Sequence, residues 1–325
     1  MFFPVIFLLT CAAEAGLSLN ISASCPSMCQ CAPEETIHCN RTGLRALPGE
    51  IATSTISLNL SNNHLRVLST NTFRNLTFLH SLWLDGNNLT FLSPGTFHAN
   101  SRLTYLLDLS HCNIFEIHPL LFSHLPSLER LDLASNNMRY VPQAFRNLSS
   151  LTKLSLEGNH IEAIGRDSLK DLESLYELNL RKNRIWIIQN GAFTKLLRLG
   201  MLNLGHNFIA DLRLLNLRNL YLNNNQISSI SDSAFLYLNK LHFLHLSKNN
   251  LSSLPSRLLA ELPKLKYVFL SHNPWQCDCR MLRFWRWTST HSRAIQGLHC
   301  AFLSPHNTTA SMMPYMRGPR MVVFS

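Results

Sequence analysis

The sequence predicts an α/β solenoid of about ten stacked repeats, whose short strands form one parallel, concave β-sheet between two disulfide-stapled end caps. Three observations support this prediction. A phrase of the form Leu-x-x-Leu-x-Leu-x-x-Asn-x-Leu recurs about every 24 residues, and cysteines gather just before its first copy and just after its last. Apolar and polar residues alternate inside the phrase, as in a half-buried strand. One copy cannot bury its own leucines, so the copies must stack.

The copy at residues 128–138 illustrates the physics of the phrase. Leu131 and Leu133 alternate with Asp132, so a short strand would point both leucines inward and the aspartate outward. Asn136 follows the strand, and its amide offers two donors and an acceptor to the turn that bends the chain away. We call the recurrence of this position the asparagine ladder: Asn63, Asn87, Cys112, Asn136, Asn159, Asn183, Asn207, Asn225, Asn249 and Asn273.

Residues 1–15 are expected to form a signal peptide. Phe2 to Leu9 is an apolar run, and Ala13, Glu14 and Ala15 fit the small-residue cleavage pattern. No later stretch is apolar over the 18 or so residues that a membrane span needs, so we expect no transmembrane segment in this chain. The product is then extracellular: secreted, or held at the cell surface if an anchor lies beyond residue 325.

Residues 25–52 are expected to form a cysteine-rich N-terminal cap. Cys25, Cys29, Cys31 and Cys39 immediately precede the first repeat. A solenoid exposes the apolar interior of its end repeats, so it needs polar or stapled ends, and disulfides supply them in an exported protein. A metal site is disfavoured because no His or Cys pair completes a tetrahedral set.

Residues 53–273 hold the ten repeats. The step from Asn207 to Asn225 is only 18 residues, which predicts a tighter coil and a local change of curvature. Phe97 is followed by Asn100 where the pattern has leucine, which predicts a looser third coil. Between the strands, a recurring Phe-x-x-Leu is expected to pack behind the sheet, led by Phe73, Phe122, Phe145, Phe193 and Phe235, with Leu169 and Leu259 as substitutes.

Residues 274–325 are expected to form a C-terminal cap that is atypical or truncated after Cys300. This cap contains Trp275, Phe284, Trp285 and Trp287. Phe284 and Trp287 are three residues apart, a helical spacing, so one aromatic face is predicted to seal the last repeat. Arg280, Arg283 and Arg286 would share another face, as a basic edge that either binds a sulfated glycan or is merely solvated.

The repeats and both caps resemble the extracellular leucine-rich-repeat proteins with cysteine-rich flanks, the group of Slit, the Nogo receptors, nyctalopin and the variable lymphocyte receptors. The resemblance implies a leucine-rich-repeat horseshoe, and it implies the pairs Cys25–Cys31, Cys29–Cys39 and Cys277–Cys300. Caps of this group have a fourth cysteine that is missing here, which leaves Cys279 without its implied partner. A truncated end or an intermolecular bridge through Cys279 would explain the departure. Cys112 is expected to be a buried thiol, since the repeat motif permits Cys at the Asn position.

Eight Asn-x-Ser/Thr sequons occur, and four lie where a surface turn is expected: Asn75, Asn88, Asn147 and Asn250. We predict these four as glycosylation sites. Asn59 lies on a predicted strand instead, where a glycan would cover part of the concave face.

The composition and motifs narrow the function. A formal net charge of +10 favours acidic partners, namely sulfated glycans, anionic lipid or acidic proteins. The export features argue against nucleic acid. The sequence has no nucleophile elbow, phosphate loop, paired metal-binding His on a helix or kinase signature, so we expect neither an enzyme nor a cofactor or metal site. The repeat alone accounts for many of its histidines, which fall beside ladder positions: His64, His111, His160, His206 and His272.

The variable residues of the concave sheet indicate where a partner would bind. The column between the paired leucines ends in Tyr221, His245 and Phe269, whereas Asp108 and Asp132 make its earlier half more acidic. Exposed aromatic residues among cations are typical of interface hot spots. The predicted partner-binding residues are Arg218, Tyr221, Phe243, His245, Lys248, Lys266, Tyr267 and Phe269.

The sequence therefore predicts a non-enzymatic extracellular protein-binding module: a receptor ectodomain, an adhesion protein or a secreted ligand that recognises a protein partner on its concave face. The alternative is an immune recognition module or a non-catalytic carrier subunit of a secreted complex.

Overall fold

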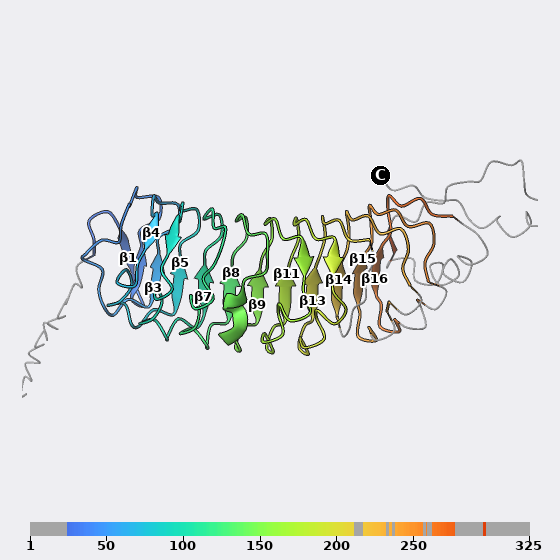
Figure 1. Ribbon diagram of the computed structural model, residues 1–325. Coiled ribbons are helices and arrows are strands. Elements are labelled where there is room, and N and C mark those ends of the chain that lie inside the picture. Colours follow the sequence, from blue (N-terminus) through green and yellow to red (C-terminus); the bar gives the residue numbers. More distant parts are fainter. Residues whose placement is uncertain are drawn as a thin grey trace, which may run out of the picture.

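A computed structural model describes residues 25–210, 217–231, 234–235, 238–255, 258 and 262–276, and the backbone of 295–296. The described chain is a solenoid that runs from the N-terminal cap to β16 (Figure 1). Its main sheet joins thirteen strands in the order β1-β2-β3-β5-β7-β8-β9-β11-β13-β14-β15-β16-β17. The predicted solenoid with a parallel sheet is confirmed. From β3 on, the strands are β3 Ser57–Asn59, β5 Ser81–Trp83, β7 Leu106–Asp108, β8 Arg130–Asp132, β9 Lys153–Ser155, β11 Glu177–Asn179, β13 Met201–Asn203, β14 Asn219–Tyr221, β15 Phe243–His245, β16 Tyr267–Phe269 and β17 Ile295–Gln296.

The N-terminal cap closes the first repeat with a hairpin. Strands β1 (Gln30–Ala32) and β2 (Thr36–His38) are antiparallel, and β2 then pairs in parallel with β3. Cys25 is bonded to Cys31 and Cys29 to Cys39, which are the two N-terminal pairs that the resemblance implied. The hairpin thereby covers the end of the sheet, and the two disulfides cross-link residues within the cap.

The alternation of the phrase appears as alternation of burial. In β8, Leu131 is buried between half-buried Arg130 and Asp132, and Leu133 follows as a second buried leucine. Adjacent strands pair leucine against leucine, as Leu131 does with Leu107. The buried side chains of all coils make one continuous core from Ile37 to Trp275, where the indole N–H of Trp275 donates to the Leu270 carbonyl at 2.8 Å.

The asparagine ladder joins each coil to the one before it. Asn183 is buried; its Nδ2 donates to Leu156 O at 2.9 Å and to Leu180 O at 3.0 Å, and its Oδ1 accepts from Ile161 N at 3.0 Å. The same arrangement recurs at Asn207 and Asn249. Each side chain therefore satisfies turn groups that would otherwise be buried without a partner.

The residue before each ladder position has a left-handed backbone. All ten have φ between 53° and 70°, although eight of them are not glycine. This conformation costs an L-residue about 1–2 kcal/mol, and Asn, Asp and Gly accept it most readily. The ten are Asn62, Gly86, His111, Ser135, Gly158, Lys182, His206, Asn224, Lys248 and His272.

The convex side consists of turns with little regular structure. It contains two small parallel sheets, β4 (Val67–Leu68) with β6 (Phe91–Leu92) and β10 (Ala163–Ile164) with β12 (Ile187–Ile188). It also contains the 3-10 helix η1 (Gln143–Asn147). The helical part of the predicted α/β solenoid is thus very small in the described residues, because 24-residue repeats leave few residues for the return segment.

The predicted phenylalanines pack behind the sheet. Phe73, Phe97, Phe122 and Phe145 are buried and stack in order, with ring centroids 6.0, 6.5 and 6.4 Å apart. Phe193, Phe235 and Leu169 are buried as well, whereas Leu259 lies outside the described residues.

The prediction of a looser third coil is wrong, because the Asn100 side chain bonds this coil to the previous one. Its side chain is only 1% exposed, and its Nδ2 donates to Phe73 O at 3.1 Å and to Leu76 O at 2.8 Å. The amide therefore replaces the expected leucine by binding backbone carbonyls of the previous coil. Its Oδ1 has no hydrogen-bond partner among the described groups.

The short repeat keeps the register of the sheet. Strands β13 and β14 pair residue for residue, and Asn225 donates to Leu204 O at 3.0 Å. Residues 211–216 of this coil lie outside the described residues, so the predicted change of curvature stays a prediction. The C-terminal cap after Gln276 also lies outside them, apart from the β17 backbone, and with it Cys277, Cys279 and Cys300.

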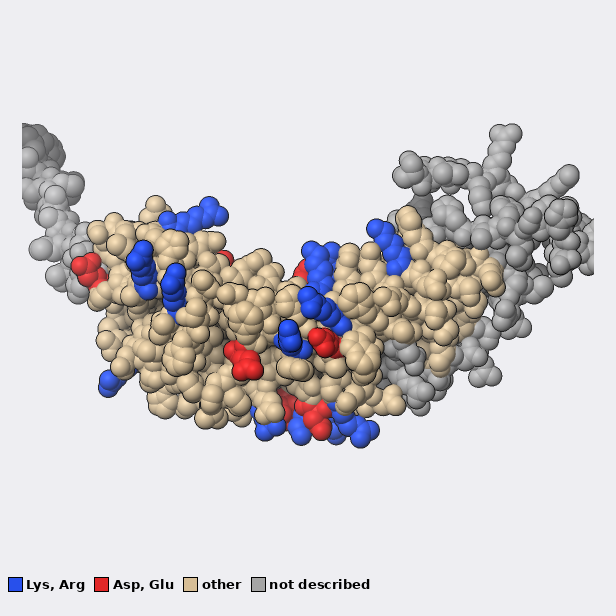
Figure 2. All heavy atoms as spheres, turned by 45° about the horizontal axis from the view of Figure 1, so that its top comes forward, with Lys and Arg blue, Asp and Glu red and all other residues tan. Residues whose placement is uncertain are grey.

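In space-filling view the described residues form an arc whose visible face is mostly uncharged (Figure 2). None of the described helices has the length and apolar character that crossing a membrane requires.

Candidate functional site

Three neighbouring strands bring five predicted partner-binding residues together on the concave face. Tyr221 of β14, His245 of β15 and Phe269 of β16 pair in register across the sheet. Phe243 and Tyr267 pair in the same way, two residues earlier in their strands. We call these five residues the aromatic cluster.

Phe243 is the centre of the aromatic cluster. Its ring centroid lies 4.8 Å from that of Tyr221, 5.1 Å from Phe269, 6.3 Å from His245 and 6.5 Å from Tyr267. His245 also contacts Phe269 at 5.0 Å. Tilted and edge contacts at these separations are favourable for aromatic pairs. The rings therefore support one another and form a preorganised surface.

The rings remain accessible to a partner. Tyr267 is 52% exposed, and the other four residues of the aromatic cluster are half-buried. Burial lowers the pKa of His245 and raises that of Tyr221, with the charge of Glu177 as a further cause at Tyr221. Both shifts favour the neutral side chains, so the cluster is an uncharged aromatic surface near pH 7.

The three predicted cations flank the strands of the aromatic cluster. Arg218 and Lys266 precede β14 and β16, and Lys248 follows β15 in the left-handed turn. All three side chains are exposed, and none forms an ion pair within the described part of the chain. They are therefore available to the carboxylates of a partner.

The earlier half of the concave face is more acidic, as predicted. Asp108 and Asp132 pair across β7 and β8, and burial raises the pKa of both carboxyls. Repulsion adds to the shift, from Asp132 at Asp108 and from Glu157 at Asp132. Between the two halves, Glu157 is paired with Arg181 at 2.8 Å. The face is thus acidic and charge-paired toward β7–β11 and aromatic-basic toward β14–β16.

The four predicted glycosylation sites, Asn75, Asn88, Asn147 and Asn250, have exposed side chains. Asn59 is half-buried on the sheet, and its Oδ1 accepts from Ser61 N at 2.9 Å. None of these five residues lies on the strands of the aromatic cluster, so glycans at them would leave its strands unmodified.

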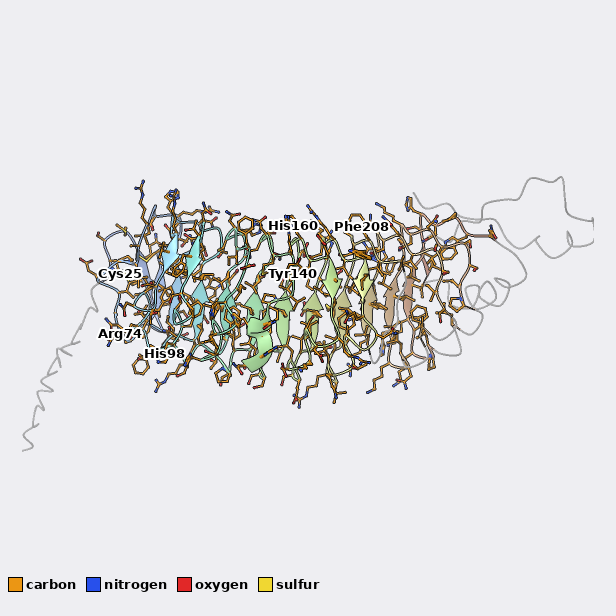
Figure 3. All side chains as sticks on the ribbon, viewed as in Figure 1. Cys25, Arg74, His98, Tyr140, His160 and Phe208 are labelled. Carbon is orange, nitrogen blue, oxygen red and sulfur yellow. A yellow bond between two sulfur atoms is a disulfide. The ribbon has the colours of Figure 1, made fainter. Side chains whose placement is uncertain are left out.

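One group of exposed aromatic residues escaped the sequence analysis. Phe115, Tyr140, Trp186 and Phe208 are between 49% and 74% exposed. They follow the ladder positions by one to four residues, where the chain leaves the concave sheet; Figure 3 labels Tyr140 and Phe208. Aligning the residues that follow each ladder position would have revealed them, because aromatic residues stand out in return turns that are expected to be polar.

Three further features of the described residues bear on chemistry other than partner binding. They contain no group of three or more His, Cys, Asp or Glu residues placed to hold a metal ion. A half-open cavity of about 380 Å³ lies between the N-terminal cap and the first coil, lined by apolar residues such as Leu47, Ile51 and Phe73. Cys112 is buried, and burial raises the pKa of its thiol to about 12, so it is not poised as a nucleophile.

Comparison with known proteins agrees with the repeat geometry. The leucine rich repeat family model matches residues 54–107, 105–161, 149–209 and 216–274. Mouse (Mus musculus) nyctalopin is 32% identical over 169 residues, which are 43% of this chain and 35% of nyctalopin. Human (Homo sapiens) leucine-rich repeats and immunoglobulin-like domains protein 1 is 32% identical over 67% of this chain and 18% of its own length. Zebrafish (Danio rerio) keratocan is 28% identical over 65% of this chain and 75% of its own length.

Among solved structures, a chain in the octameric complex of Latrophilin 3, Unc5D and FLRT2 superposes with a TM-score of 0.64 at 25% identity. The match covers 85% of this chain and 93% of that one, and FLRT2 supplies the leucine-rich repeats of that complex. The chain spans about a third of nyctalopin and less than a fifth of the human relative. Nyctalopin belongs to the group that the two caps and the repeats resemble. With the family model matched over most of its length, this chain belongs to the leucine-rich-repeat proteins.

Proposed function

We propose that this chain is a non-enzymatic, extracellular protein-binding module whose partner docks on the concave face at the aromatic cluster. The observation that carries the proposal is the contact of Phe243 with all four other rings on an accessible sheet surface. Aromatic groups already held in place lose little entropy on binding and provide large apolar contact areas.

The partner should present an apolar surface bordered by carboxylates. Arg218, Lys248 and Lys266 are exposed and without ion pairs among the described residues, so a partner's acidic groups can pair with them at the rim of the interface. Rim charges of this kind raise the association rate and select the partner more than they add affinity. The similar solved complex is an assembly of three proteins, one of which contributes leucine-rich repeats, and this supports a protein rather than a small molecule as ligand.

The surrounding assignments belong to the same proposal. Residues 1–15 act as a signal peptide, residues 25–52 and 274–325 as caps, and Asn75, Asn88, Asn147 and Asn250 carry glycans. The mature chain is secreted, or displayed at the cell surface if an anchor lies beyond residue 325. Arg280, Arg283 and Arg286 are a candidate edge for a sulfated glycan, and the pairing of Cys277 with Cys300 would leave Cys279 for a bond to another chain.

The test is an affinity capture in which the wild-type bait is compared with two variants. The secreted chain would be immobilised and exposed to surface-labelled membrane extracts, and the captured proteins would be quantified by mass spectrometry. The first variant combines Tyr221→Ala, Phe243→Ala and Phe269→Ala; the matched control combines Trp83→Ala, Asp108→Ala and Asp132→Ala on the other half of the same face.

A protein captured by the wild type and the control but lost with the first variant would support the proposal, and its dissociation constant would then be measured with purified partner. The opposite pattern would place the interface on the acidic half. Capture of a receptor, of an adhesion protein or of a component of a secreted complex would separate the main proposal from the carrier or immune-recognition alternative.

A further inference from the structure

His98 and His124 lie side by side on neighbouring coils, away from the concave face. Their ring centroids are 4.2 Å apart and their planes are inclined by 65°. Both side chains are exposed, and His98 lies at the lower edge of the solenoid in Figure 3. We propose that these two imidazoles form a site for a divalent transition metal ion, with Cu²⁺ as the best-suited ion.

Hydrogen bonds around Ser123 determine which nitrogen of His124 can bind a metal. The Ser123 hydroxyl donates its single proton to Leu120 O at 2.8 Å. Its oxygen also lies 2.9 Å from His124 Nδ1, so it must accept a hydrogen bond there from Nδ1–H. A neutral imidazole protonated on Nδ1 keeps its lone pair on Nε2. Ser123 therefore prepares Nε2 of His124 as a metal ligand.

The separation of the two rings fits a right-angled pair of ligands. A metal–nitrogen bond of about 2.0 Å places the centre of an imidazole ring about 3.2 Å from the metal. Two imidazoles at neighbouring corners of a tetragonal site then have centres about 4.5 Å apart. The observed 4.2 Å is close to this value, and tetragonal geometry with nitrogen ligands is the preference of Cu²⁺.

The backbones that present the two histidines are held firmly. His98 follows Phe97, and His124 comes two residues after Phe122; these two phenylalanines are buried and stack at 6.5 Å. His98 N donates to Gly95 O at 3.0 Å, and Leu125 N donates to Phe122 O at 3.0 Å. A rigid pair of ligands loses little freedom when it binds an ion, which favours chelation over binding to isolated histidines.

The site is open, with room for ligands from elsewhere. No third His, Cys, Asp or Glu ligand joins the pair in the part of the chain that is described, so water or a group from another molecule would complete the coordination. The proposal is independent of the concave face, because neither histidine lies on its strands.

Cu²⁺ itself is the probe, added at one equivalent to the full secreted chain with glycine as a competing ligand. Pulsed electron paramagnetic resonance should report two equatorial imidazoles in the wild type. The variants His98→Ala and His124→Ala should each show one imidazole signal fewer. Each should raise the dissociation constant for Cu²⁺ about a hundredfold, because the second ligand no longer binds intramolecularly. The matched control is His64→Ala, which removes another exposed histidine and should change neither reading.

Ser123→Ala should weaken Cu²⁺ binding about tenfold through loss of the orienting hydrogen bond, and Ser123→Thr should restore it. Circular dichroism of each variant would check that the fold is intact. If the variant that combines His98→Ala with His124→Ala keeps the wild-type affinity and the two-imidazole signal, the first equivalent of Cu²⁺ binds elsewhere and the proposal is wrong. Ser123→Ala binding as tightly as wild type would overturn the role given to Ser123.

Discussion

Asn183 Nδ2 donates a 2.9 Å hydrogen bond to the carbonyl oxygen of Leu156, and this bond crosses from one coil to the one before it. Because the side chain is buried and bonded on both its oxygen and its nitrogen, Asn183→Ala would leave several backbone groups without partners. We expect it to lower the free energy of unfolding by about 3 kcal/mol, measured by urea denaturation. Asn190→Ala, at an exposed position seven residues later, should leave the urea midpoint nearly unchanged.

The left-handed turn position offers a change in the opposite direction. Ser135 has φ of 54°, and its backbone N–H donates to Glu157 O at 2.6 Å. Glycine or valine at this position would keep that N–H. Ser135→Gly should raise the free energy of unfolding by about 0.5–1 kcal/mol, since glycine accepts this backbone at lower cost despite its larger unfolded-state entropy. Ser135→Val should lower it. Equal denaturation midpoints for the glycine and valine variants would show that the backbone is not strained.

The stability of the acidic half should depend on pH. Burial raises the pKa of Asp108 above the ordinary 3.8, with Asp132 and Asp85 adding repulsion, so ionisation in the folded state weakens the fold as pH rises through that raised pKa. Asp108→Asn keeps an acceptor for Ser110 N and should have the higher melting temperature at pH 7. Its advantage should vanish below pH 3.8, where both folded and unfolded wild-type chains are protonated. Asp167→Asn, at an exposed position away from the strands of the concave sheet, is the control for replacing an aspartate by asparagine.

Cys112 should behave as a core residue and not as a reactive thiol. Its side chain is fully buried, its Sγ donates to Leu84 O at 3.1 Å, and burial raises its pKa to about 12. In the native protein, iodoacetamide at pH 8 should leave Cys112 unmodified, while the same treatment in urea should label it; peptide mass spectrometry separates the two results. Labelling of the native chain at the rate of a free peptide would contradict the burial argument.

Within the aromatic cluster, Phe243 should be the most sensitive position. Its ring contacts all four others, so Phe243→Ala removes its own contact area and the support of its neighbours. We expect a loss of about 2–4 kcal/mol in binding to the captured partner, measured by surface plasmon resonance. Tyr267→Ala, at the more exposed edge, should cost less. A larger loss at Tyr267 than at Phe243 would move the centre of the interface toward the C-terminal end of the sheet.

Much of the fold could be predicted from the sequence because every repeat carries the same pattern of buried leucines and a turn asparagine. The spacing of Leu131, Leu133 and Asn136 determines a strand, its inward face and the turn that follows, and ten copies multiply the signal. The five aromatic residues could be brought together on paper because parallel strands in register place equal positions side by side. The resemblance of the caps implied the pairs of Cys25 and Cys29.

Features that depend on departures from the repeat pattern could not be predicted from the sequence. Asn100 replaces a core leucine, and only its bonds to the carbonyls of Phe73 and Leu76 show how an amide can fill that place. The contact between His98 and His124 arises because they sit one and two residues after stacked phenylalanines, an offset that the ladder does not predict. The residues that favour a left-handed backbone, Gly and Asn, occupy that turn position in only four of the ten repeats: Asn62, Gly86, Gly158 and Asn224.

The strand order has a consequence for how the number of repeats can change during evolution. Each central strand pairs only with the strands of the preceding and following coils, and ladder bonds such as Asn183 to Leu156 also join neighbours alone. Loss or duplication of one coil can therefore occur without repacking the rest. Loss or duplication of a coil between the acidic half and the aromatic cluster would change their separation by about 4.8 Å, the spacing of adjacent strands. The length of the concave face can thus change in steps of one coil to fit a new ligand, while the residues at both of its ends are kept.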